Sequence, residues 1–172
     1  MKTFIIKKFK IISLFFVIAI MITIFLLSAQ SAQDSSELSG KIVDVVIKIV
    51  LPHYNELSYT EQQQIKEKVS LIVRKLAHFT EFAVLGFFLM LHLLTYKPYI
   101  KSFNFKLFIR AVISWIIGTL YAFSDELHQM FVTDRYSSVY DVMIDSSGVL
   151  VGIFLLILLL LIVFKSNRFS SL

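Results

Sequence analysis

The sequence predicts an all-α protein that crosses a membrane four times and forms one domain over residues 1–172. Three observations predict this class: 57% of the residues are apolar, the mean hydropathy is +0.78, and four long apolar stretches alternate with polar ones. We therefore expect membrane lipids to be the main partners of the surface. The absence of cysteine excludes disulfides and thiolate chemistry.

The first span is predicted over residues 11–27, which carry no charge and follow four lysines. A cleaved signal peptide is the alternative, because small polar residues follow at 28–33. The hydrophobic region of a signal peptide is usually about 7–15 residues long, so this longer run favours a retained helix.

Residues 28–75 form a long loop in which two amphipathic helices are expected. Asp34 and Glu37 indicate the start of the first, and Pro52 ends it. Ser58 and Glu61 have the spacing of a capping box, and an apolar stripe follows them towards the second span. We expect both helices to lie on the membrane or to cap the bundle.

The other spans are predicted at about 76–96, 107–124 and 139–164. Ser138 and Asp141 form a capping pattern before the last span. Gly148 and Gly152 share a face of that span, which allows a neighbouring helix to approach closely.

The charge pattern predicts the orientation of the chain. The amino terminus, residues 97–110 and the carboxyl tail contain ten Lys or Arg and no acidic residue. Basic residues favour the cytoplasmic side, so we expect a multi-pass protein of the plasma membrane with both termini in the cytoplasm and loop 28–75 outside. The basic residues form no dense run, so nucleic acid is not an expected partner.

Two polar motifs, at 74–87 and 121–148, meet the external membrane boundary, and the second holds five of the twelve acidic residues. Ionisable groups at the start of a span usually face protein or a wet cavity, so we predict one shared site. The candidate catalytic residues are His78, Glu126, His128 and Asp145. The candidate binding residues are Lys75, Glu81, Asp125, Gln129, Arg135 and Asp141.

The spacing also raises the question of a metal. His78 and Glu81 on one helix and Asp125 and His128 on its antiparallel neighbour would present carboxylate and imidazole at matching depths, as in a bundle-core metal site. A hydrogen-bonded ion network, with pairs such as Arg135 and Asp145, explains the same residues without a metal. We assign no metal ligand and leave the cofactor unknown. Structural readings also remain open, since Lys75 could anchor the membrane interface and Asp141 could serve the helix amino terminus.

Taken together, these motifs resemble the VanZ-like family of bacterial membrane proteins over residues 12–165. The resemblance is carried by Lys75, His78, Phe79 and Phe82, by Ser-Asp-Glu-x-His-Gln at 124–129, by Arg135, and by Asp141 through the Asp145-Ser-x-Gly148-x-x-x-Gly152 run. Thr133 and Asp134 replace the Pro and Gly that relatives often have before this arginine. The founding member lowers susceptibility to the glycopeptide teicoplanin without the altered peptidoglycan terminus that other resistance proteins use.

The resemblance implies an envelope protein that lowers susceptibility to glycopeptides such as teicoplanin by modifying or masking an envelope component. A lipid-linked cell-wall precursor or another envelope glycolipid is the expected partner. One alternative is an intramembrane hydrolase or transferase, acting on a lipid-linked phosphate or glycan, in which a carboxylate is the base and Lys75 and Arg135 hold the anion. A second is a structural ion network without catalysis.

Overall fold

The computed structural model describes residues 2–96, 103–133, 135 and 137–169, and within them the chain is all-helical. The elements are α1 (Lys2–Ser28), α2 (Ala32–Val50), the short 3-10 helix η1 (Tyr54–Glu56), α3 (Tyr59–Leu94), α4 (Phe103–Gln129) and α5 (Val139–Phe169). Helices α1, α3, α4 and α5 are each long and apolar enough to cross a membrane. These findings confirm the predicted all-α, polytopic membrane class.

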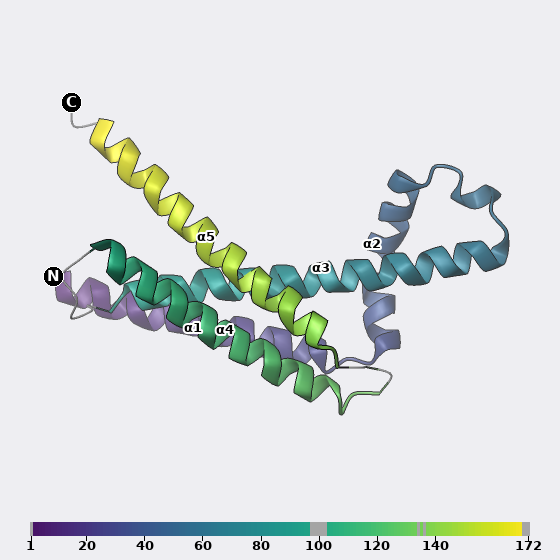
Figure 1. Cartoon of the computed structure of the whole chain (residues 1–172), viewed down its shortest axis with the longest axis horizontal. Coiled ribbons are helices and arrows are strands. Elements are labelled where there is room, and N and C mark those ends of the chain that lie inside the picture. Colours follow the sequence, from purple (N-terminus) through teal and green to yellow (C-terminus); the bar gives the residue numbers. More distant parts are fainter. Residues whose placement is uncertain (1, 97–102, 134, 136, 170–172) are drawn as a thin grey trace.

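Helices α1, α4 and the second half of α3 lie side by side, and α5 crosses α3 and then diverges from the bundle (Figure 1). The core lies between them and is built from Val17, Ile24, Phe82, Leu85, Leu89, Met90, Ala122, Val149, Ile153 and Leu156. Helix α1 contributes to this core and is therefore a packed member of the bundle. Tyr121 adds a hydrogen bond to α1, since its hydroxyl donates to the Met21 carbonyl over 2.6 Å.

Glycines set the crossing of α3 and α5. A Cβ atom at Gly148 would collide with the carbonyl oxygen of Phe79, and one at Gly152 would collide with that of Ala83. Gly86 of α3 stands in the same close relation to the backbone of Val149. The predicted close approach at Gly148 and Gly152 is therefore confirmed, and its partner is α3.

The helices extend beyond the predicted spans. The second amphipathic helix of the loop is not separate, because α3 runs without a break from Tyr59 into the second span. Its predicted capping box is confirmed: the Ser58 side chain accepts the Glu61 N–H, and a Glu61 carboxylate oxygen accepts the Ser58 N–H over 3.0 Å. Since no Pro or Gly stands between residues 59 and 85, nothing ends the helix at the membrane boundary.

Helix α2 crosses α3 steeply and packs on its first half (Figure 1). It begins at Ala32, two residues before Asp34, and its N-cap Ser31 accepts the Asp34 N–H over 3.1 Å. It ends at Val50, just before Pro52, as predicted.

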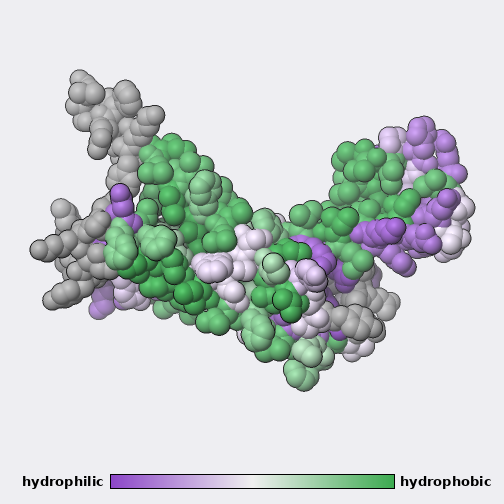
Figure 2. Space-filling view, in the orientation of Figure 1, coloured by the Kyte–Doolittle hydropathy of each residue, from purple (hydrophilic) through white to green (hydrophobic). Residues whose placement is uncertain are grey.

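The α2–α3 hairpin has polar and apolar surfaces. Val43 and Ile47 are buried, whereas Ile42 and Ile49 remain more than half exposed. Figure 2 shows hydrophilic residues gathered along the projecting half of α3 and hydrophobic residues over much of the bundle. The exposed apolar face of α2 needs a partner other than water, which agrees with the expected membrane association.

Candidate functional site

A cavity of about 300 Å³ lies where α3, α4 and α5 meet near one end of the bundle. We call it the polar cavity. Its lining residues are Leu71, Arg74, Lys75 and His78 of α3, Glu126 and Gln129 of α4, Arg135 and Ser138 of the connection, and Asp141, Ile144 and Asp145 of α5. Seven of the ten predicted site residues therefore share one space, although their positions span about seventy residues of sequence.

The local fold explains how each helix supplies its polar groups. Arg74, Lys75 and His78 recur at the three- and four-residue spacing of one helical face. Helix α4 continues past the predicted boundary at 124 to Gln129, so Glu126 and Gln129 lie on its last turns. Asp141 and Asp145 lie four residues apart on the first turns of α5, and both therefore face the same way.

The predicted capping pattern at the start of α5 is formed in part, because the Ser138 hydroxyl oxygen accepts the Tyr140 N–H over 3.2 Å. Asp141 pairs with Lys75 of α3 rather than with the start of its own helix. Glu126 takes the capping role, because its carboxylate accepts the Ser138 N–H over 2.9 Å. The long connection between α4 and α5 brings Glu126 within reach, and this contact fixes α5 against the end of α4.

Arg135 organises a row of polar contacts that reaches α1. Its Nε donates to the Gln30 carbonyl over 3.2 Å, and its Nη1 donates to Gln129 Oε1 over 3.3 Å. Gln129 Nε2 donates in turn to Asp125 Oδ2 over 2.9 Å, and the Ser28 hydroxyl donates to the same oxygen over 2.8 Å. The row joins the end of α1 to the end of α4.

Two guanidinium groups face the polar cavity without an acidic partner. Among the residues that the structure describes, neither Arg74 nor Arg135 has a carboxylate within ion-pair distance. Burial lowers the pKa of Arg135 from its ordinary value, and the positive charge of Arg74 lowers it further, while Asp125, Glu126 and Glu81 act in the opposite direction. Arginine still stays charged, so two like charges face one space.

Several buried polar atoms also lack partners. Asp145, whose exposed fraction is 2%, leaves Oδ2 without a hydrogen bond, and the same holds for Oδ1 of Asp125, Oε2 of Glu81 and Nδ1 of His128. Buried polar atoms in proteins are nearly always paired, with protein or with ordered water. Asp145 is the one of these four that lines the polar cavity, where it can meet a ligand together with His78.

The structure separates three predicted residues from the polar cavity. Glu81 lines a different cavity, and Asp125 is buried in the row described above. The His128 ring stacks on Phe25 with the ring centroids 4.4 Å apart. Within the described ranges, no three His, Asp or Glu residues are grouped so that they could hold a metal ion. The suggested pair of Arg135 and Asp145 is likewise not formed.

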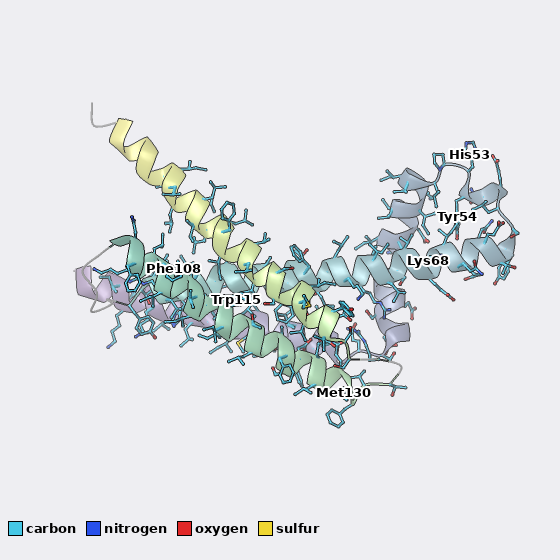
Figure 3. The ribbon with its side chains drawn as sticks, viewed as in Figure 1. His53, Tyr54, Lys68, Phe108, Trp115 and Met130 are labelled. Carbon is cyan, nitrogen blue, oxygen red and sulfur yellow. The ribbon has the colours of Figure 1, made fainter. Side chains whose placement is uncertain are left out.

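Sequence reasoning missed some residues that this arrangement uses. Arg74 begins the first polar motif and lies four residues before His78, but it was not among the predicted binding residues. Ser28 and Gln30 carry no such signal, since each contacts residues about a hundred positions away in the sequence. At the far tip of the hairpin, His53 lies well away from the bundle (Figure 3).

These features define a class: a polytopic helical membrane protein with a charged cavity at one end of its bundle. The family described as VanZ/LLP1 has a model that matches residues 13–163, which is most of the chain. The chain therefore belongs to the VanZ/LLP1 family, as its motifs indicated. No protein of curated function and no solved structure matches it significantly.

Proposed function

We propose that this VanZ/LLP1 protein binds a phosphate-bearing lipid of the cell envelope in its polar cavity. One observation carries the proposal: Arg74 and Arg135 face the same cavity and lack a described carboxylate partner. A phosphate between them would replace their repulsion with two charge-assisted contacts. The three acids of the cavity, one of which is paired with Lys75, make the site selective for a ligand that also offers donors.

Binding of this kind would account for a role in the cell envelope. Holding or altering a lipid-linked cell-wall precursor, or another envelope glycolipid, would lower the access of glycopeptides such as teicoplanin to their target. The polar cavity must then face the outside of the plasma membrane. This placement follows from the ten basic residues in the amino terminus, residues 97–110 and the carboxyl tail.

Reporter fusions test the orientation. A reporter at Asn55 or Ser137 should register the outside, and one at Ser102 should register the cytoplasm. A cytoplasmic signal from Ser137 would place the polar cavity on the wrong side of the membrane for this function.

The lipid proposal is tested with the purified full chain in detergent, by native mass spectrometry with phosphatidylglycerol and phosphatidylcholine as probes. Wild type should retain phosphatidylglycerol better than phosphatidylcholine. The double variant Arg74→Gln with Arg135→Gln should remove this preference, with each substitution lowering phosphatidylglycerol retention about tenfold. Arg110→Gln is the matched control, because Arg110 donates to the Tyr96 carbonyl near the other end of the bundle. An unchanged preference in the double variant would refute the proposal.

A hydrolase is the second candidate, favoured by the unpaired Asp145 oxygen in the same cavity as His78. In this reaction water attacks a phosphorus atom of a polyprenyl diphosphate, its proton passes to the Asp145 carboxylate, and the bridging P–O bond breaks to release inorganic phosphate. His78 would return a proton to the leaving oxygen. Asp145→Asn should then keep lipid binding and lose phosphate release, whereas a wild type that releases no phosphate would exclude this candidate.

A further inference from the structure

A second cavity, of about 570 Å³, lies on the opposite face of α3. Its walls are apolar and come from three helices, with Ile24 of α1, Val46 of α2 and Leu76 of α3 among them. The residues that α3 gives to this cavity, such as Leu76 and Thr80, are about half a helical turn away from Arg74 and His78. We call it the apolar pocket, and its size is within the range of small-molecule sites.

One polar group of the apolar pocket lacks a hydrogen-bond partner. The hydroxyl groups of Thr23 and Thr80 donate to carbonyls of their own helices, over 2.9 Å and 2.7 Å, so both are satisfied. Oε2 of Glu81 is buried and has no hydrogen-bond partner, and no described cation lies within ion-pair distance of that carboxyl group. An ionisable group inside a spanning helix usually marks a ligand or a partner.

The position of the apolar pocket indicates what can reach it. Helix α2 roofs it through Ile42 and Val46, while Val43 and Ile47 hold the same helix against α3. Glu81 lies seven residues beyond Arg74, which places it about 10 Å further along the helix axis. The walls that α1 and α3 supply belong to helices long and apolar enough to span a membrane, where the surrounding medium would be lipid, and α2 covers them from outside the spans.

We propose that the apolar pocket binds one lipid acyl chain whose polar end carries a hydroxyl or amide N–H that donates to Glu81. The apolar walls fit the chain, and the single unsatisfied acceptor fits one donor beside it. The apolar pocket shares no lining residue with the polar cavity, although the charges of Glu81 and Arg135 interact. The proposal does not rest on the function proposed above.

Native mass spectrometry of the purified full chain tests the proposal with two probes that share one chain. Monooleoylglycerol has free hydroxyl groups, whereas methyl oleate has none. Wild type should retain monooleoylglycerol about tenfold more strongly than methyl oleate, because only the first can donate to Glu81. Equal retention of the two probes by wild type would overturn the proposal.

Two variants locate the binding. Glu81→Leu should remove the discrimination and leave both probes bound at the methyl oleate level. Ala77→Phe should fill the pocket and release both probes, and Ile113→Phe, at an exposed position on α4 outside the pocket, is its control. Discrimination that survives Glu81→Leu, or equal retention by the two phenylalanine variants, would show that the probes bind elsewhere.

Discussion

At the end of the bundle where α3 finishes, a buried histidine has partners on both ring nitrogens. His92 Nδ1 lies 2.9 Å from the Ser13 hydroxyl of α1, and Nε2 lies 3.3 Å from the Tyr96 hydroxyl. The Lys10 ammonium stands 3.7 Å from the centroid of the Tyr96 ring. At the opposite end, Asp145 in the polar cavity and Glu81, Asp125 and His128 outside its lining each keep a buried atom without a partner.

Both ends contain buried polar groups, and they differ in whether those groups have hydrogen-bond partners. A fully paired group such as His92 fastens α1 to α3 and needs nothing further. An unpaired buried acceptor costs stability, and such a cost persists in proteins chiefly at sites where a ligand or a reaction uses the group. Stability and ligand binding should accordingly respond to mutation in opposite ways at the two ends.

The largest effect on stability should come from disrupting the glycine crossing of α3 and α5, which lies between the two ends. Gly152→Leu would drive a side chain into the Ala83 carbonyl and the Phe87 backbone, and should destabilise the chain by at least the roughly 3 kcal/mol of severe overpacking. Size-exclusion chromatography and thermal unfolding in detergent measure this loss. Gly40→Leu is the control, since a Cβ there meets nothing within 4 Å. Similar behaviour of the two variants would mean that the crossing does not hold the bundle together.

The paired end should show a smaller, purely structural effect. His92→Leu leaves Ser13 without its interhelical partner and should cost about 1–3 kcal/mol of unfolding free energy while phosphatidylglycerol retention stays unchanged. Combining it with Ser13→Ala should cost less than the sum of the two single changes, by about 1 kcal/mol. Additive losses would show that the two residues are not coupled.

The smallest effect on stability should come from Asp145→Asn. Oδ2 of Asp145 has no partner to lose, so stability should change by less than about 0.5 kcal/mol or should rise. If the cavity hydrolyses its lipid, protection against teicoplanin should nevertheless fall, because Asp145 is the proposed base. Asp44→Asn on the hairpin serves as the charge-matched control, and susceptibility tests beside thermal unfolding check both quantities. A loss of about 3–5 kcal/mol, typical of a broken buried ion pair, would assign Asp145 to the scaffold.

The parts of the fold that depend on local chemistry could be predicted from the sequence. The capping box at Ser58, the stop before Pro52 and the close approach at Gly148 and Gly152 each follow from residues a few positions apart. Helix lengths were underestimated because the apolar spans were taken as the helices. Backbone hydrogen bonding does not stop where the lipid does, so α4 continues to Gln129.

The site was harder to predict in its details, because its pairings join distant segments. Helical spacing brought Lys75, His78 and Asp145 to one end of the bundle, and the structure places all three around the polar cavity. Nothing local indicated that the Ser28 hydroxyl would meet Asp125, or that the His128 ring would stack on Phe25. Rotation about each helix axis decides such contacts, and only packing sets that rotation.

The unbroken length of α3 has a mechanical consequence. At 36 residues it is about 54 Å long, well beyond the roughly 30 Å of a hydrocarbon layer. If α3 pivots at its glycine crossing with α5 near Gly86, the part of α3 that moves, from Tyr59 to Gly86, is about 40 Å long. A tilt of about five degrees would swing the hairpin tip by roughly 3 Å and the Arg74 backbone by about half as much. A force applied to the hairpin tip would therefore produce a displacement about half as large beside the polar cavity.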